Sequence, residues 1–252
     1  MPNRASTKPT DVTGKLISAA ERLSVAVDRL EFSAPITHVY NPLNYAAAAH
    51  RQYLQRCQPK TTHTLFLGMN PGPWGMAQTG VPFGQIEAVR DWIGIDAAIT
   101  KPANEHPKRP ILGLDCRRSE VSGQRLWGLF RDRFGTAEAF FHEHFVINYC
   151  PLVFMEASGR NRTPDKLPAA EAARLDRVCD THLAELLRLI TPTTVVGVGA
   201  YAEKCLLRVV AAAEVDCRVA RILHPSPASP AANRDWAGRA TAELVAAGVW
   251  SA

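Results

Sequence analysis

Four short apolar runs, separated by stretches with helical periodicity, constrain the fold of this chain more than any other feature. The runs occupy residues 64–69, 145–150, 194–199 and 219–224. They are nearly continuous in apolar character and rich in β-branched residues, which is typical of strands buried on both faces of a sheet. Helical patterns accompany them at residues 41–57, 83–95, 119–134, 168–190, 200–213 and from 230 onward. This alternation predicts a three-layer α/β/α fold, with a central, mainly parallel four-stranded sheet between two layers of helices.

The length and composition of the chain suit one such domain. Of its 252 residues, 46% are hydrophobic and 21% are charged, as in ordinary globular proteins. We find no internal repeat and no sign of a second domain. We therefore expect a flexible N-terminal tail over residues 1–10 and a single domain over residues 11–252.

Several classes of protein are excluded by what the sequence lacks. The six cysteines are scattered without a CxxC pair, which argues against a disulfide framework, a zinc ribbon and an iron–sulfur cluster. No apolar run approaches the roughly 18 residues of a membrane span, and the N-terminus lacks the apolar core of a signal peptide. We expect an intracellular protein with no membrane partner, in the cytoplasm or nucleoid of a bacterium or the nucleus of a eukaryote.

The charge of the chain permits a polyanionic partner without identifying one. The formal net charge is +5, and the basic residues gather in turn-rich stretches rather than on helix faces. These stretches contain Lys108, Arg109, Arg117 and Arg118, and further on Arg160, Arg162 and Lys166. Phosphate contacts are one interpretation of both stretches, and solvated loops are the other.

Polar side chains follow three of the predicted strands where each strand ends. Asn70 follows the first strand, Asn148 lies near the end of the second, and His224 ends the fourth. A proline-containing turn comes after each of them and stiffens the backbone. Ligands of open parallel sheets bind beyond the carboxyl ends of the strands. We therefore expect these side chains to meet in a rigid, uncharged polar pocket.

Each of these residues also has a purely structural interpretation. Asn70 alone would serve as a turn former, and Asn148 as a backbone cap. His224 would be an ordinary histidine beside a proline turn. Phe83, in the segment that follows the first strand, would be a core residue. Their convergence on one end of one predicted sheet favours a site.

The residues of the expected pocket exclude several kinds of chemistry. It contains no Cys, Asp or Glu and so has no metal-ligand set, and we expect neither a metal nor another cofactor. Ser226 lies two residues from His224 with no acid nearby, which argues against a Ser-His-Asp triad. The sequence also lacks the GxxxxGK[ST] motif of nucleoside triphosphate sites.

Three stretches of the sequence resemble one known family. They are GMNPGPWGMAQTGVPFG at residues 68–84, VINYCPL at residues 146–152 and HPSPASPAANRDW at residues 224–236. All three are similar to the single-strand-selective monofunctional uracil-DNA glycosylases of the uracil-DNA glycosylase superfamily. The likeness extends to HPKRPILGL, SEVSGQRLW and EASGRNRTP, and so covers most of the chain from about residue 35 to residue 240.

The resemblance implies a DNA repair enzyme. It implies hydrolysis of the N-glycosidic bond of uracil and of 5-substituted uracils such as 5-hydroxymethyluracil, with an abasic site as the product. The target base leaves the stack to be reached. We expect a monomer that acts on uracil-containing single- and double-stranded DNA.

The resemblance also implies roles for the residues of the pocket. Asn70 would orient the attacking water, and His224 would donate to uracil O2 as negative charge develops there. Phe83 would stack on the flipped base, and Asn148 would read its N3–H and O4. The wall beside the C5 position would be formed by Met69, Gly72 and Met76. Because the motifs contain no lysine to form a Schiff base, a monofunctional enzyme is expected.

The third motif implies a loop that enters DNA, made of Pro225, Ser226, Pro227, Ala228 and Ser229, with Arg234 on the helix that follows. Vertebrate members of the family carry a basic residue at the position of Ala228, and Trp74 stands where relatives often have Phe. Two alternatives stay open at this point. One is the same fold with another base specificity, for hypoxanthine, xanthine or mismatched thymine, and the other is a non-catalytic lesion-binding protein.

Overall fold

Four parallel strands form the central sheet, in the order β3-β2-β6-β7. They are β2 (Thr64–Gly68), β3 (His144–Asn148), β6 (Thr194–Val198) and β7 (Arg218–Ile222). The computed structural model describes residues 11–251, so the tail expected at residues 1–10 lies outside the described residues. All four predicted strands are present, and every residue of β2 and β6 is buried.

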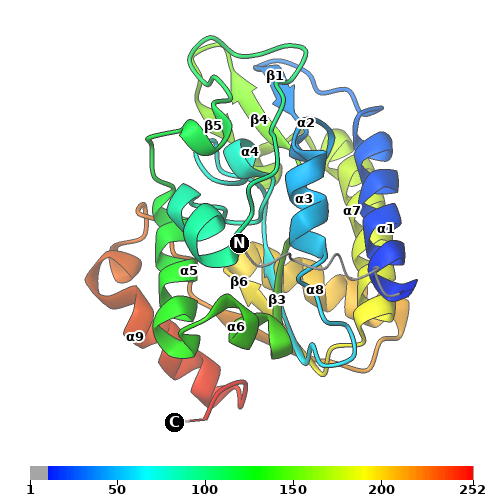
Figure 1. Ribbon diagram of the computed structural model, residues 1–252. Helices are drawn as coiled ribbons and strands as arrows, with labels where there is room; N and C mark the ends of the chain where they lie inside the picture. The colour runs from blue at the N-terminus through cyan, green and yellow to red at the C-terminus, as the bar shows by residue number, and fades with distance from the viewer. Residues whose placement is uncertain (1–10, 252) are drawn as a thin grey trace.

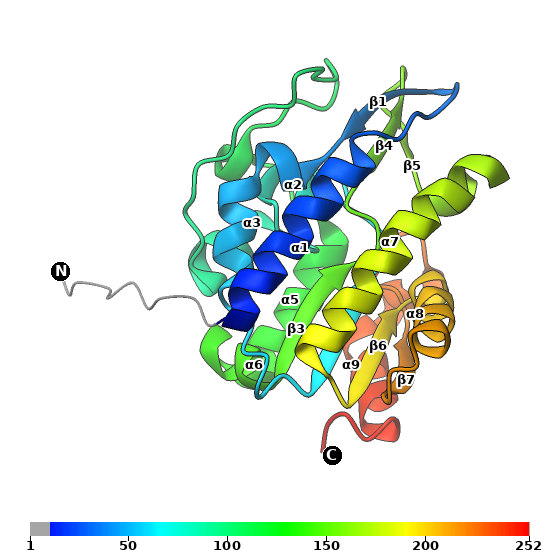
Figure 2. The ribbon, with the colours of Figure 1, turned by 90° about the vertical axis from the view of Figure 1, so that its right-hand side faces the viewer.

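Helices cover both faces of this sheet (Figures 1 and 2). One face carries α1 (Asp11–Val27), α7 (Ala169–Ile190) and α8 (Ala200–Ala213), and the other carries α5 (Val121–Phe134) and α9 (Pro230–Ala246). The helices divide between the two faces because each connection between parallel strands is a right-handed crossover, so the direction of travel across the sheet decides which face a helix covers. The chain moves across the sheet in one direction from β3 through α7 to β6 and through α8 to β7, whereas it moves in the opposite direction from β2 to β3. The predicted three-layer α/β/α fold is confirmed.

The shorter helices differ in part from the sequence prediction. The helix expected at residues 41–57 is split into α2 (Pro42–Tyr45) and α3 (Ala47–Leu54), and the one expected at residues 83–95 is only a π-helical turn, η1 (Ala88–Ile93). The latter cannot extend because Phe83 has φ 54° and Gly94 has φ 73°, neither of which is helical. The remaining short elements are α4 (Met76–Thr79), α6 (Ala137–Glu143), η2 (Gly113–Asp115) and η3 (Pro164–Lys166).

A second, antiparallel sheet was not predicted. It has the order β1-β4-β5 and consists of β1 (Ile36–Tyr40), β4 (Val153–Glu156) and β5 (Asn161–Arg162). Its central strand follows the Asn148 exit of β3 after a turn through Pro151. The small sheet therefore stands beside the carboxyl end of the parallel sheet and adds residues to that edge.

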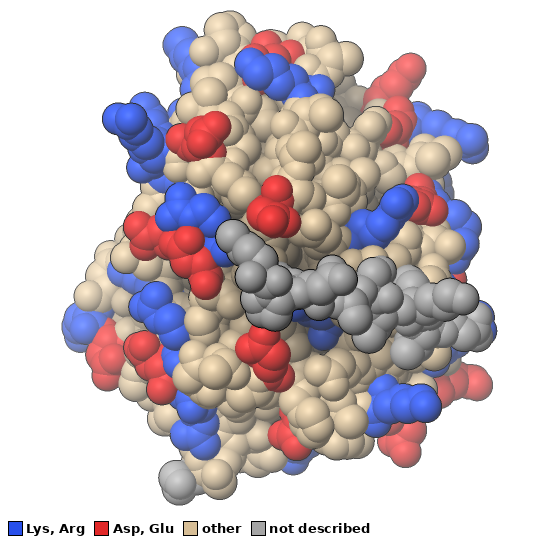
Figure 3. Space-filling view, in the orientation of Figure 1, with Lys and Arg blue, Asp and Glu red and all other residues tan. Residues whose placement is uncertain are grey.

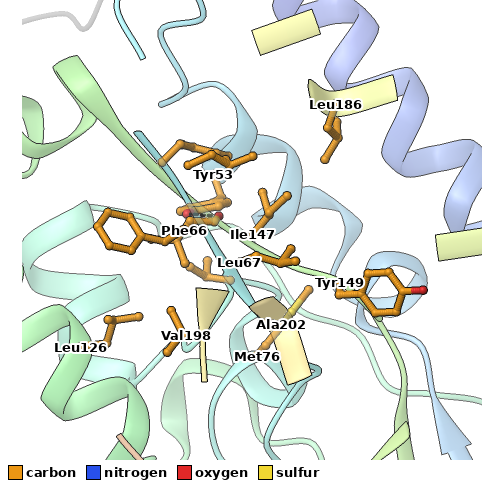
Figure 4. Packing of buried hydrophobic residues seen from close by; sticks show 14 of the residues in the cluster. Tyr53, Phe66, Leu67, Met76, Leu126, Ile147, Tyr149, Leu186, Val198 and Ala202 are labelled. Atoms are coloured by element: carbon orange, nitrogen blue, oxygen red, sulfur yellow. Dashed lines mark hydrogen bonds between the residues drawn. The ribbon is translucent and has the colours of Figure 1, made fainter. Parts of the chain in front are cut away.

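Aromatic side chains in the core fix the loop that leaves β2. Trp127 of α5 is fully buried, and its indole N–H donates to the carbonyl of Pro82 at 3.1 Å. Tyr53 of α3 donates to the carbonyl of Val146 in β3 at 2.7 Å. Figure 4 shows Tyr53, Phe66, Leu67 and Ile147 packed together in this region. The loop after β2 is thus anchored in the core at a point next to Phe83.

Candidate active site

A cavity of about 510 Å³ lies at the carboxyl ends of the parallel strands. Many of the residues predicted from the sequence line it: Met69, Asn70, Gly72, Phe83, Asn148, His224, Ser226, Ala228 and Ser229. Four of the predicted residues do not. Met76 is buried next to Asn148 and borders a second cavity of about 30 Å³, Pro225 is buried, and Pro227 and Arg234 are exposed.

The side chain of Asn70 is fixed through its Nδ2 atom, which leaves Oδ1 to accept a hydrogen bond. Its Nδ2 donates to the carbonyl of Leu152 at 3.0 Å and lies 3.5 Å from the carbonyl of Pro71. The hydrogen bonds between β2 and β3 continue beyond the strands, from Tyr149 N–H to the Gly68 carbonyl and from Cys150 N–H to the Met69 carbonyl. The segment that carries Asn70 is therefore rigid. With the NH₂ group engaged by the backbone, Oδ1 is the atom available to accept a hydrogen bond.

Asn148 ends β3 with an unsatisfied acceptor. Its Oδ1 is buried and has no hydrogen-bond partner among residues 11–251, and its Nδ2 lies 3.3 Å from the sulfur of Met76, a weak acceptor. A buried polar atom without a partner costs about 1–3 kcal/mol. A ligand N–H that met Oδ1 would recover this free energy.

Phe83 sits beside Asn148 in a strained conformation. Its φ of 54° is in the left-handed region, which is unusual for an aromatic residue. A Cβ at Gly68 would collide with both the Phe83 ring and Asn148 Oδ1, and a Cβ at Gly123 would collide with the Phe83 carbonyl. Two glycines thus make room for Phe83, which lines the cavity beside the Asn148 amide. Strain of this kind is maintained where the surrounding structure demands it, often at functional sites.

His224 reaches the cavity across a neighbouring strand exit. The exits that carry Asn70 and His224 are not adjacent, because β6 lies between β2 and β7 in the sheet. The exit of β6 is Gly199, with φ 96°, and a Cβ there would lie 3.0 Å from the His224 Cβ. The ring centroids of His224 and Phe83 are 6.2 Å apart. Burial lowers the pKa of His224 below its ordinary value, so the imidazole is neutral at pH 7.

Comparison with known proteins identifies the family to which these features belong. Residues 54–245 match the uracil DNA glycosylase superfamily over most of the chain. The chain belongs to this superfamily. The single-strand selective monofunctional uracil-DNA glycosylase of Rattus norvegicus is 48% identical over 215 residues, which cover 85% of this chain and 77% of that protein. The corresponding protein of Bos taurus is 49% identical over 215 residues, covering 85% of this chain and 79% of that protein.

A solved structure of low sequence identity has the same fold. The crystal structure of SMUG2 from Pedobacter heparinus superimposes with a TM-score of 0.62 at 20% identity, covering 92% of this chain and 97% of that one. The expected superfamily, the uracil-DNA glycosylase-like fold and the glycosylase class of enzyme are confirmed. The individual site residues remain predictions that the geometry supports.

The loop after β7 is anchored by a residue that was missed in the sequence. Arg125 of α5 donates through Nη1 to the carbonyls of Pro225 at 3.1 Å and Ser226 at 3.4 Å, and through Nη2 to Asn233 Oδ1 at 2.9 Å. Asn233 in turn donates to the carbonyl of Pro227 at 2.8 Å. Arg125 belongs to the SEVSGQRLW stretch, which the sequence marked only by its likeness to the superfamily.

Further lining residues come from stretches that were quoted from the sequence only for their likeness to the superfamily. They are Pro71, Pro73, Glu120, Ser122, Asn161 and Thr163. The carboxyl group of Glu120 packs against Gly72 and Gly75, and burial raises its pKa, so the expected pocket without acids does contain one. Arg162, considered for phosphate contacts, is paired instead with Glu156 at 2.7 Å.

Neither metal ligands nor a membrane span is found in the part of the chain that the structure describes. Within residues 11–251, no three His, Cys, Asp or Glu side chains gather as a metal site would require. In the same range, no helix combines the length and the apolar character needed to cross a bilayer.

Proposed function

We propose that this chain removes uracil, and 5-substituted uracils such as 5-hydroxymethyluracil, from DNA by hydrolysing the N-glycosidic bond. The observation that carries the proposal is the partnerless, buried Oδ1 of Asn148 beside the Phe83 ring. That pair suits a flat base with an N–H donor on its edge. The product is an abasic site, which makes the reaction the first step of base excision repair.

Base recognition follows from the polarity of the Asn148 amide. Its Oδ1 accepts from uracil N3–H, and its Nδ2 exchanges the sulfur of Met76 for the stronger acceptor O4. Cytosine offers an acceptor at N3 and a donor at C4, so both contacts would be mismatched. A site built around such hydrogen bonds discriminates by about 10⁴-fold. Stacking on Phe83 contributes about 1–3 kcal/mol.

The walls of the cavity define the space beside the base. Met69 and Gly72 line this cavity, and buried Met76 supports Asn148 from behind. The space that a side chain at Gly72 would fill holds the carboxyl group of Glu120, a polar group at this wall. This arrangement suits substrates with a small polar group on C5.

The chemistry needs charge stabilisation and one oriented water. The C1′–N1 bond breaks with its electron pair moving into the uracil ring, and the sugar becomes cation-like. Neutral His224 donates a hydrogen bond to O2, where the negative charge develops. Asn70 Oδ1 accepts a hydrogen bond from the water whose oxygen then bonds to C1′, and the released proton passes to solvent. No Lys among residues 11–251 lines the cavity, so the enzyme hydrolyses the N-glycosidic bond and leaves the sugar–phosphate backbone intact.

The proposed enzyme acts as a monomer, without metal or cofactor, on single- and double-stranded DNA containing uracil. Its place of action is the cytoplasm or nucleoid of a bacterium or the nucleus of a eukaryote. A lesion-binding protein without catalysis is less consistent with the site, because binding alone does not require the fixed amide of Asn70. Specificity for hypoxanthine, xanthine or mismatched thymine would be revealed by a panel of base analogues.

The test is release of uracil from end-labelled oligonucleotides in the presence of EDTA. We expect an abasic product whose strand breaks only after alkali, and unchanged rates with the chelator. Asn70→Ala and His224→Ala should each lower the single-turnover rate by about 10²-fold or more. His63→Ala is the matched control, since His63 is exposed and precedes β2 at the opposite edge of the sheet. Full activity in either site variant would overturn its role, and loss of activity with EDTA would overturn the metal-free reaction.

A further inference from the structure

Trp74 holds two arginines at the rim of the cavity. The guanidinium carbon of Arg118 lies 4.4 Å from the centre of the Trp74 ring, and that of Arg109 lies 5.0 Å from it. Attraction between guanidinium groups and an indole ring favours this arrangement. The three residues come from separate segments, so the fold brings them together. We refer to them below as the Arg–Trp–Arg cluster.

The charges of this cluster are not neutralised by the protein. Neither arginine forms an ion pair with a carboxylate among residues 11–251, whereas Arg162 is paired with Glu156 and Arg208 with Asp180. Arg109 donates through Nε to the carbonyl of Gly159 at 2.9 Å, which fixes its position without removing its charge. Over the face seen in Figure 3, basic and acidic side chains are interspersed. Two like charges on one ring repel each other, and an anion bound to both would relieve this repulsion.

The cluster is adjacent to the proposed base pocket. Trp74 follows Pro73, which lines the cavity, and Arg118 precedes the lining residue Glu120 by two positions. The carboxyl group of Glu120 packs on Gly72 and Gly75 instead of pairing with either arginine. A DNA strand whose nucleotide enters the cavity would therefore pass close to the Arg–Trp–Arg cluster.

We propose that the Arg–Trp–Arg cluster binds the phosphate backbone of the DNA strand that carries the target base. This inference rests on the proposed function and assigns residues to strand binding rather than to base recognition. Guanidinium groups match phosphate oxygens in geometry and charge. The cluster offers nothing that distinguishes one base from another, because the indole ring is already in contact with cations. Its contribution is therefore independent of sequence and strongly dependent on salt.

The experiment measures binding of a fluorescent single-stranded oligonucleotide without uracil, over a range of salt concentrations. Each phosphate contact to a single strand contributes about 0.7 to the slope of log K against log salt. We expect Arg118→Ala to make the slope shallower by about 0.7 and to weaken binding several-fold at low salt. Arg109→Ala should act in the same direction, and Arg118→Lys should keep most of the slope. Arg188→Ala is the control of equal charge, because Arg188 is exposed near the end of α7, just before β6 begins.

The outcomes separate this inference from the proposed function. If Arg118→Ala and Arg109→Ala both keep the wild-type slope, or if Arg188→Ala lowers it equally, the cluster is not a phosphate site. Because Arg118 is exposed, Arg118→Ala is less able than Arg109→Ala to disturb the fold. Circular dichroism checks that both variants are folded. Failure of the wild-type protein to release uracil would overturn the proposed function, yet the salt dependence of binding could still be measured.

Discussion

At the scale of single residues, the site depends on atoms that folding leaves without a partner. Among residues 11–251, Asn148 Oδ1 is buried without a hydrogen-bond partner, whereas the NH₂ group of Asn70 donates to the Leu152 carbonyl and leaves its Oδ1 available to accept. In the proposed mechanism the two asparagines therefore have opposite roles: Asn148 reads the base and Asn70 orients the water. The proposed base-reading role also accounts for an amide rather than an aspartate at position 148: a charged carboxylate cannot donate to O4, and it would resist burial.

Replacement of the base-reading amide should separate catalysis from DNA binding. We expect Asn148→Ala to lower the rate of uracil excision by about 10²–10³-fold, because two buried hydrogen bonds are lost. Affinity for DNA with an abasic site should stay nearly unchanged, since the amide contacts no part of the backbone in the proposed complex. Single-turnover rates and fluorescence anisotropy measure the two quantities. A parallel loss of both would mean that Asn148 supports the fold instead.

At the scale of elements, the loop after β7 is rigid but lacks a large side chain at its tip. Arg125 and Asn233 hold its carbonyls, and Ser229 caps α9 by accepting from Ala232 N–H. Ala228 lies exposed at the edge of the cavity. A base that leaves a duplex creates a gap, which alanine is too small to fill. We therefore expect the enzyme to depend on base pairs that are already weak.

This feature predicts an order of substrates. Wild-type protein should excise uracil faster from single strands and from U·G mismatches than from U·A pairs, because less unpairing free energy is required. Ala228→Arg should improve the rate on U·A duplexes more than on single strands. Single-turnover rates on the three substrates measure this, with Ala237→Arg on α9 as the control for added charge. Equal rates on all three substrates, unaffected by Ala228→Arg, would show that this loop does not limit base flipping.

The elements also show what could be predicted from the sequence. The four buried strands were predicted because their apolar runs reflect burial on both faces, and Asn70, Asn148 and His224 because strand ends share one edge. The small sheet was missed because its strands are short and one of them, β5, spans only Asn161–Arg162. Glu120 and Arg125 were missed for another reason. Their roles arise from packing between distant segments, which no local pattern records.

At the scale of the whole molecule, the C-terminal segment is joined to the central sheet through a buried histidine. Trp250 donates its indole N–H to Nε2 of His144, the first residue of β3, at 3.2 Å. The His144 ring also stacks with Phe66 and Phe140. Burial lowers the pKa of His144 from 6.5 to about 4, and a neutral ring is required to accept from Trp250.

The stability of the fold should therefore decrease in mild acid. In the unfolded chain His144 takes up a proton near pH 6.5, whereas in the folded chain it stays neutral down to about pH 4. The stabilisation is complete above pH 6.5 and is lost as the pH falls toward 4. One such proton changes the free energy of unfolding by about 1.4 kcal/mol per pH unit in this window. Urea denaturation between pH 7 and pH 4.5 measures it, and His144→Phe should flatten the dependence by that amount. An identical pH dependence in both proteins would exclude His144 as the cause.

The position of the His224 side chain depends on Gly199, which has no side chain of its own. This glycine does not line the cavity of about 510 Å³, yet its lack of a side chain lets His224 lie against the exit of β6. A Gly199→Ala protein carries one additional methyl group, strained by φ 96° and pressed against the His224 Cβ. We expect it to fold, to bind uracil-containing DNA and to flip the base, while bond cleavage slows by about 10²-fold because the imidazole is displaced from O2. Retention of the full single-turnover rate would contradict this. If cleavage slows as expected, the difference between a repair enzyme and a lesion-binding protein in this scaffold amounts to one hydrogen atom replaced by a methyl group.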